Sequence, residues 1–377
     1  MNGPASPALG HVPGVRRLAV LRANGMGDLV FSLPALAALR AAYPEAEITL
    51  LGAPWHAELL EGRPGPVDRV LVVPVSRGVR GDERTEDDTE ALDAFFTGIR
   101  DERLDLALQL HGGGRYSNPF VRRLGARVTV GMKDRDAIGL DRVLPYAYWQ
   151  NEVMRYLEVV SLVGAPAVTL EPALAVTPAD VEASLAAVPP RGSPLVVLHP
   201  GASDPRRRWP PERFAAAADE LAAAGAAVAL VAAAEERHLT AAVRMAMRQP
   251  ALDLGGGLSL RALLGLLARA RVFVGNDSGP LHLALAAGAA SVGIYWCGNM
   301  INGGPLTRRR HRAGVSWRVH CPVCDANIVE EGCTHDTSFV ADVPVDLIVR
   351  EALDLLKSPQ SAQGASTLLS STVVGSS

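Results

Sequence analysis

Residues 271–289, RVFVGNDSGPLHLALAAGA, carry the pattern on which the expected fold rests. Residues 272–274 form an apolar run typical of a strand buried on both faces of a parallel sheet, and the polar turn 276–279 follows it. Pro280 suits the first position of a helix. The free N–H groups and the dipole at such a helix start attract anions. We therefore expect a strand, a turn and a helix, with a phosphate site at the turn.

Four side chains or backbones at this turn are candidates for ligand binding. Gly279 lets a phosphate approach the backbone, Ser278 adds a hydroxyl donor, and His282 in the first helical turn can donate to a phosphate or a sugar hydroxyl. The structural alternative is that Asp277 or Ser278 only caps the helix and that His282 has a structural role.

The same order of strand, glycine-containing turn and helix recurs along the chain. Strands are expected within residues 18–21, 47–52, 69–75 and 104–110, then, after a proline-containing linker at 164–180, within 194–199, 227–231, 271–275 and 291–296. This alternation predicts two Rossmann-like α/β domains with parallel sheets. Ligands bind at the carboxyl ends of such strands, so a cleft between the two domains is the expected site.

Composition narrows the class of protein further. The chain has 377 residues, a net charge of −3 and 48% apolar residues, which is enough for two cores and argues against nucleic-acid binding through bulk charge. We find no apolar run of membrane-spanning length and no secretory signal, so we expect a cytoplasmic protein. Residues 1–14 and 358–377 are expected to be disordered tails.

HPGASDPRRRWPPERF, residues 199–214, places three arginines at the end of an expected strand. If Arg206, Arg207 and Arg208 lie there, they face the same cleft as the 276–279 turn, and a guanidinium grips phosphate oxygens with two parallel hydrogen bonds. Trp209 is expected to pack over the loop. The structural alternative is a solvated basic run.

LRANGMGDLVFSLPAL, residues 21–36, has the corresponding position in the first half. Gly25 and Gly27 permit a tight turn with close ligand approach. The spacing is not that of a dinucleotide fingerprint because Val30 stands where the last glycine belongs, which disfavours a dehydrogenase. Asp28 begins the helix and is a candidate general base, with a helix cap as the alternative. After another strand, Glu235 and Glu236 are candidates for binding ribose hydroxyls, and a solvated loop is the alternative.

Cysteines and a basic run mark the C-terminal part. Cys321, Cys324, Cys333 and His335 follow the pattern C-P-V-C-x8-C-x-H, which could bind zinc, although buried reduced thiols are the default for a cytosolic chain. The run 307–312 could touch an anionic acceptor or a membrane surface, or be solvated.

Three motifs occur in an order that resembles glycosyltransferase family 9, the ADP-heptose:lipopolysaccharide heptosyltransferases and their relatives. The motifs are RANGMGDLVFSLPALAALRAAYPEAEITLLG, HPGASDPRRRWPPERF and VGNDSGPLHLALAAGAASVGIY. The similarity runs from about residue 17 to about residue 356. The resemblance implies a GT-B fold of two facing Rossmann-like domains, with residues 15–168 binding the acceptor and residues 169–357 binding the nucleotide sugar. It also implies inverting transfer without a metal ion, and no cofactor is expected.

The resemblance also implies residue roles. The family's proposed base maps to Asp28, and its diphosphate-binding basic residue, usually Lys, maps to Arg207, with Arg206 and Arg208 as neighbours that could compensate. The phosphate and sugar motif maps to Asp277, Ser278, Gly279, Pro280 and His282, and the ribose-binding acid maps to Glu235 or Glu236. The cysteine cluster resembles a C-terminal feature found in part of the family, so no separate function is assigned to it.

The expected function is transfer of a sugar, with heptose from ADP-heptose as the best candidate, to a hydroxyl of a lipopolysaccharide core or another cell-surface glycan. The expected partners are the nucleotide sugar and a glycan or glycolipid acceptor, with peripheral contact at the cytoplasmic face of the membrane as an option. The alternatives are a nucleotide-sugar epimerase of the same fold and a non-catalytic nucleotide-sugar-binding protein.

Overall fold

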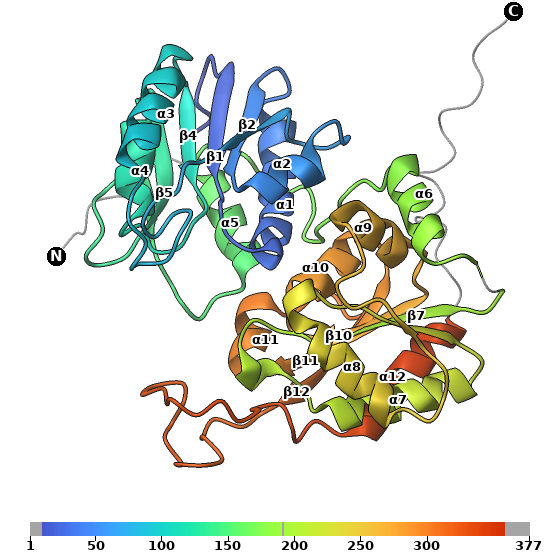
Figure 1. Cartoon of the computed structure of the whole chain (residues 1–377). Coiled ribbons are helices and arrows are strands. Elements are labelled where there is room, and N and C mark those ends of the chain that lie inside the picture. The colour runs from blue at the N-terminus through green and yellow to red at the C-terminus, as the bar shows by residue number, and fades with distance from the viewer. Residues whose placement is uncertain (1–9, 191, 359–377) are drawn as a thin grey trace, which may run out of the picture. The chain divides into compact units, whose positions relative to one another are not determined.

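The computed structural model describes residues 10–190 and 192–358 (Figure 1). Contacts between Cα atoms divide the chain into two compact units that meet in sequence at Pro172 and Ala173. Each unit is an α/β domain with its own parallel sheet. The division falls inside the proline-containing segment 164–180.

The described residues of the first unit form a six-stranded parallel sheet in the order β3-β2-β1-β4-β5-β6. This is the strand order of a Rossmann fold. Its elements are β1 (Arg17–Leu21), α1 (Met26–Ala42), β2 (Glu47–Gly52), α2 (Pro54–Leu60), β3 (Arg69–Val72), α3 (Thr89–Asp101), β4 (Leu106–Gln109), α4 (Ser117–Arg123), β5 (Val128–Lys133), β6 (Arg142–Pro145) and α5 (Glu152–Ser161).

The described residues of the second unit repeat that order in another six-stranded parallel sheet, β12-β11-β10-β7-β8-β9. Its elements are α6 (Pro178–Ala187), β7 (Leu195–His199), η1 (Pro205–Arg207), α7 (Pro211–Ala223), β8 (Ala227–Leu230), η2 (Ala234–Glu236), α8 (Arg237–Ala246), β9 (Leu252–Asp253), α9 (Leu260–Arg269), β10 (Val272–Asn276), α10 (Gly279–Ala286), β11 (Ala290–Trp296), α11 (Cys297–Gly303), β12 (His311–Ser316) and α12 (Val345–Lys357).

Side-chain alternation along the strands builds the core of the second unit. Alternate strand residues such as Val272 and Val274 are fully buried on one face of the sheet, where Phe214 of α7 and Ile348 of α12 pack against them. Burial on both faces explains why these strands are continuous apolar runs. The core rigidly positions the loops that leave the carboxyl ends of the strands.

Residues 10–14 correct the expectation of a disordered N-terminal tail for that part of the chain. Val12 is 2% exposed, and its N–H donates to the Tyr43 hydroxyl at 3.1 Å. The His11 ring stacks on Tyr43 with centroids 4.5 Å apart. The expectation was wrong for these residues because it rested on the proline and glycine content of residues 1–14, which gives no sign that one apolar side chain is buried. Residues 1–9 and 359–377, the rest of the two expected tails, lie outside the described residues.

Among the described helices, none combines the length and the apolar character required to cross a bilayer.

Candidate active site

The loops after β7 and β10 lie side by side in the second unit because these two strands are neighbours at the centre of the sheet. Strand order reverses between them, and open α/β sheets bind ligands at this point. The Asn276 side chain joins the loops, since its amide donates to the Pro200 carbonyl at 2.8 Å and its oxygen accepts from the Trp209 N–H at 2.9 Å. Trp209 is fully buried, and its indole donates to the Val343 carbonyl at 3.0 Å. The loop that carries the arginines is therefore anchored from beneath.

Arg207 reaches the turn after β10. Its Nη1 lies 3.2 Å from Oδ2 of Asp277, and its Nη2 donates to the Ser203 hydroxyl at 2.8 Å. The other Asp277 oxygen lies 2.9 Å from Nε2 of His282. Three of the expected site residues thus form one hydrogen-bonded chain, in which the Arg207 side chain stays 25% exposed. A guanidinium in this position can meet an anion that approaches the start of α10.

Ser278 stands at the N-cap position of α10, yet in the described part of the chain its side chain makes no capping hydrogen bond. Its hydroxyl instead donates to the Asn276 carbonyl at 3.1 Å and lies 3.2 Å from Nδ1 of His199. Gly279 and Pro280 form the first turn of the helix. The side chains of this turn therefore belong to a network across the strand ends rather than to a helix cap, and the turn keeps the character of an anion site.

Glu235 and Glu236 differ in environment although they are adjacent. Glu235 is exposed, whereas Glu236 turns inward and places one oxygen 3.5 Å from Nε2 of His199 and the other 3.7 Å from Nη2 of Arg208. The hydrogen bond from His199 lowers the pKa of Glu236. A Cβ at Gly201 would lie 2.2 Å from a Glu236 oxygen, so this close approach requires glycine. Of the two acids, Glu236 is the one brought to the strand ends.

The arginine triplet does not act as one patch, which corrects the expectation that all three face the 276–279 turn. Arg206 forms an ion pair with Asp204 at 2.7 Å and stacks its guanidinium over the Phe339 ring, 5.6 Å from the centroid. Arg208 donates to the Ala202 carbonyl at 2.9 Å. The short 3-10 turn η1 sends successive side chains in different directions, so only Arg207 among the three meets Asp277 in the described structure.

In the first unit, Asp28 lies in the first turn of α1, directly after β1. Its Oδ1 is 2.6 Å from Nη2 of Arg22, and its Oδ2 accepts the N–H of Gly25 at 3.1 Å. Asp28 thus bonds to the N-cap residue, as the structural alternative allowed, and also carries an ion pair. The Asp28 side chain is 35% exposed, so part of the carboxylate remains accessible.

Gly25 and Gly27 do not form the tight turn expected of them. Gly25 has φ −73° at the N-cap of α1, and Gly27 lies inside the first turn of that helix. Neither is among the described glycines with positive φ. The chain reverses here by starting a helix, which any residue permits, so the glycines are not required by backbone conformation. At Gly25 an added Cβ would lie 3.5 Å from an Asp28 oxygen, so this glycine leaves that side of the carboxylate uncovered.

A buried polar cluster that sequence reasoning missed surrounds Arg22. The guanidinium is 3% exposed, donates to the Leu110 carbonyl at 2.7 Å and lies 5.0 Å from the centroid of the Tyr156 ring. His111, two residues after β4, accepts the Ala23 N–H at 3.4 Å. Arg22 and His111 stand within two residues of the carboxyl end of a central strand, and that position was the available signal. The same signal would have singled out His199, the last residue of β7.

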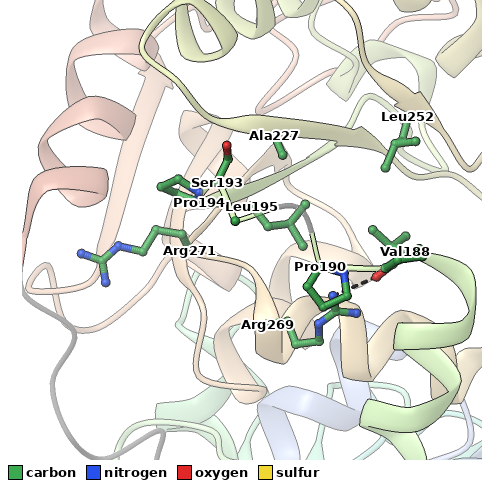
Figure 2. Close-up of a pocket in the computed structure, with 11 residues that line it drawn as sticks. Val188, Pro190, Ser193, Pro194, Leu195, Ala227, Leu252, Arg269 and Arg271 are labelled. Atoms are coloured by element: carbon green, nitrogen blue, oxygen red, sulfur yellow. Dashed lines mark hydrogen bonds between the residues drawn. The ribbon is translucent and has the colours of Figure 1, made fainter.

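The cavity shown in Figure 2 lies elsewhere in the second unit. It has a volume of about 360 Å³ and is lined by Leu195, Ala227 and Leu252, the first residues of β7, β8 and β9. It therefore opens at the amino ends of the strands, the edge opposite the loops described above. Its two arginines are already used, since Arg269 donates to the Val188 carbonyl at 2.8 Å and Arg271 to the Leu356 carbonyl at 3.2 Å. This cavity is not the candidate site.

Comparisons with known proteins agree with this geometry. Residues 93–325, more than half of the chain, match glycosyltransferase family 9 (heptosyltransferase). Lipopolysaccharide heptosyltransferase 2 of Salmonella typhimurium strain LT2 is 26% identical over 298 residues, which cover 74% of this chain and 82% of that protein.

Two solved structures share the fold. The glycosyl transferase family 9 protein from Veillonella parvula DSM 2008 has a TM-score of 0.73 and 19% identity, over 90% of this chain and 97% of the other. The E. coli ADP-heptose lps heptosyltransferase II has a TM-score of 0.71 and 20% identity, over 90% of this chain and 98% of the other. The predicted α/β fold of the GT-B class is confirmed. The chain belongs to glycosyltransferase family 9 (heptosyltransferase), and it is a glycosyltransferase enzyme.

Proposed function

We propose that this glycosyltransferase moves heptose from ADP-heptose to a hydroxyl of a lipopolysaccharide core or another cell-surface glycan, with inversion and without a catalytic metal ion. Residues 15–168 form the acceptor domain and residues 169–357 the donor domain. The relatives named above support the donor, because one of them is named for ADP-heptose. The division of contacts at Pro172 and Ala173 supports a boundary between two domains in this part of the chain.

The observation that carries the proposal is the contact of Arg207 with Asp277, in the turn directly before α10, at the point where strand order reverses in the second sheet. Arg207 and the N–H groups at the start of α10, with the Ser278 hydroxyl, would bind the diphosphate. Glu236 would accept hydrogen bonds from ribose hydroxyls. Asp277, held by Arg207 and His282, would contact the sugar.

Positive charge at this site would let the reaction proceed without a divalent cation. As the bond between the anomeric carbon and the diphosphate breaks, the electron pair leaves with ADP, whose terminal phosphate gains negative charge. Fixed donors aimed at that developing charge stabilise the transition state. Arg207 would direct a guanidinium group at that charge, and Arg208, which lies 3.7 Å from Glu236, would contribute a second. Together they would replace the charge that a metal ion supplies.

Asp28 is the proposed general base. The acceptor oxygen forms its bond to the anomeric carbon while its proton passes to the Asp28 carboxylate. Arg22 and the Gly25 N–H hold that carboxylate in one orientation, and its partial exposure leaves room for a substrate hydroxyl. Ordering of the base before the acceptor binds reduces the entropic part of the barrier.

The test is the Asp28→Ala variant, assayed with ADP-heptose and a heptose-accepting glycolipid. We expect transfer to fall by about 10²–10⁴-fold, the usual contribution of a general base, with nucleotide binding retained. Normal turnover by this variant would refute the base assignment. Release of an epimerised sugar from donor alone would favour the epimerase alternative, and donor binding without turnover by the wild type would favour a non-catalytic binding protein.

The donor can be identified by a thermal-shift screen of nucleotide sugars, because stabilisation grows with ligand concentration relative to the dissociation constant. ADP-heptose is expected to stabilise the protein more than UDP, GDP or dTDP sugars at equal concentration. A larger shift with another nucleotide would overturn the donor assignment.

Contact with the cytoplasmic face of a membrane is part of the proposal, since a glycolipid acceptor resides there. Arg308 and Arg309 are exposed and can meet an anionic surface. The rest of the run 307–312 contributes less, because His311 is buried in β12 and Arg312 pairs with Glu351 at 3.4 Å. Sedimentation with anionic vesicles, compared with an Arg308→Gln/Arg309→Gln variant, tests this contact.

A further inference from the structure

Three cysteines and one histidine converge in the segment between β12 and α12, the long orange-red stretch of Figure 1. One ligand atom each from Cys321, Cys324, Cys333 and His335 lies within 4.8 Å of all the others, and Cys321 Sγ is 3.7 Å from His335 Nδ1. In a tetrahedral zinc site the ligand atoms are roughly 3.5–3.8 Å apart, given Zn–S near 2.3 Å and Zn–N near 2.0 Å. The four atoms are therefore already close to the spacing that one ion imposes.

The backbone around Cys321 holds its sulfur in place. The Cys321 N–H donates to the Ala326 carbonyl and the Asp325 N–H donates to the Cys321 carbonyl, both at 2.9 Å. Asp325 has φ 59°, the left-handed conformation that closes this turn.

Residues 317–335, which contain the four side chains, have little regular structure. They contain one isolated bridge, His320 to Asn327, and the described structure assigns them no helix or strand. Trp317 is 75% exposed and Val323 is 57% exposed, whereas the buried residues Phe339, Val340 and Val343 come only after His335. Connections longer than about 12–15 residues without secondary structure are uncommon in compact domains. A metal cross-link supplies the ordering energy that burial does not provide here.

We propose that Cys321, Cys324, Cys333 and His335 bind one Zn²⁺ in a closed structural site. Three sulfurs and one imidazole nitrogen fill a tetrahedral shell, which leaves no open position for substrate. Thiolate-rich donor sets favour zinc over magnesium or calcium, which prefer oxygen ligands. The four cysteines of the chain are free thiols, so no disulfide competes for these sulfurs.

The proposed zinc site would also support residues 203–209, the loop that carries the three arginines (the arginine loop). Three and four residues after His335, the Ser338 hydroxyl donates to the Arg208 carbonyl at 2.6 Å and the Phe339 N–H donates to the Arg206 carbonyl at 2.7 Å. The Arg206 guanidinium donates to the Cys333 carbonyl at 3.5 Å. A metal ion that fixes residues 321–335 would therefore also fix the loop that carries Arg207. The effect on donor binding rests on the function proposed above, whereas the effect on loop order does not.

The first experiment measures metal content of the full chain purified without chelators. We expect about one zinc ion per chain, and we expect Co²⁺ in its place to give the visible spectrum of tetrahedral thiolate coordination. Cys324→Ser and Cys333→Ser should lose the metal, while Cys297→Ser, which removes a free cysteine outside the cluster, should keep it. Failure of the wild type to hold or take up Zn²⁺ or Co²⁺ would overturn the site. Iron at one per chain in place of zinc would overturn the choice of metal.

The second experiment compares amide hydrogen exchange in the zinc-loaded protein, the chelator-treated protein and Cys324→Ser. Exchange is expected to accelerate at least tenfold in residues 317–340 and in residues 203–209 when the metal is absent, and the ADP dissociation constant is expected to rise about tenfold. Unchanged exchange at 203–209 would overturn the support of the arginine loop. Metal binding and exchange as expected, with no ADP binding in any form, would contradict the proposed function and leave the metal site standing.

Discussion

Nη2 of Arg22 lies 2.6 Å from Oδ1 of Asp28, and the two residues differ in exposure: the Arg22 side chain is 3% exposed and that of Asp28 is 35% exposed. The buried guanidinium is itself held by the Leu110 carbonyl, at the end of β4. The central strands of the first sheet therefore fix the arginine, and the arginine fixes an accessible carboxylate. Arg22 is a positioning residue for the proposed base.

Arg22→Lys tests that role. Lysine keeps the positive charge but cannot hold Asp28 and Leu110 with a planar fork. We expect kcat to fall roughly 10–100-fold, as small misplacement of a catalytic group does, with the ADP dissociation constant within about twofold of the wild type. Steady-state kinetics and ADP titration measure the two quantities. A purely structural arginine would instead change thermal stability and leave kcat of the folded enzyme unaltered.

Glu236→Gln and Glu235→Gln form a matched pair. The Glu236 carboxylate lies at the strand ends beside His199 and Arg208, whereas Glu235 is exposed. Loss of a charged acceptor for ribose hydroxyls should weaken ADP binding by about tenfold in the first variant, because hydrogen bonds to charged groups contribute about 1.5–3 kcal/mol. The second variant should bind ADP as the wild type does. Isothermal titration calorimetry measures both, and weaker binding by Glu235→Gln alone would reverse the assignment.

Arg207→Gln and Arg207→Lys separate charge from geometry at the proposed diphosphate site. Glutamine removes the charge that meets Asp277 and should weaken ADP binding about 10–100-fold. The family resemblance implies a lysine at this position, so Arg207→Lys should lose less affinity for ADP than Arg207→Gln. Arg244→Gln makes the same change of charge at an exposed position of the same unit and should leave ADP binding unchanged. Equal affinities for Arg207→Gln and the wild type would remove Arg207 from the donor site.

Much of the fold could be predicted from the sequence because the central strands are buried on both faces. β1, β2, β10 and β11 are apolar runs next to glycine-containing turns, and the structure places strands there. β5, β6, β9 and β12 were not predicted, and of these only β5 lies inside a sheet. β12 begins inside the basic run 307–312 and mixes buried with partly exposed residues. Edge strands lack the continuous apolar pattern that identifies central ones.

The candidate site could be predicted less completely, because its polar contacts join residues far apart in sequence. The motif around residue 278 indicated a helix start, but not that Asp277 would bridge Arg207 and His282. Adjacent Glu235 and Glu236 cannot be separated by pattern, since the 3-10 turn η2 decides which one points inward. Arg22 was missed because a single arginine after a strand has no periodicity to mark it.

Two buried histidines make the first unit sensitive to acid. His56 is fully buried and His111 is 6% exposed, and burial, followed by the charge of Arg22, lowers the pKa of each to about 3. An unfolded chain protonates histidine near pH 6.5. Unfolding therefore takes up protons between about pH 6.5 and pH 3. The contribution of each neutral histidine to stability is present above pH 6.5 and is lost as the pH falls toward 3.

His56→Asn combined with His111→Gln should flatten this pH dependence, because neither replacement titrates and both can accept the backbone N–H that the histidine accepts. From pH 7 to pH 5 the wild type should lose about 2 kcal/mol of unfolding free energy for each of the two histidines. Urea unfolding at pH 7, 6 and 5, followed by tryptophan fluorescence, measures the difference. His238→Gln, at an exposed histidine of the second unit, should keep the wild-type slope. A double variant as acid-sensitive as the wild type would show that other groups govern the response, and that these histidines take up a proton as readily in the folded chain as in the unfolded one.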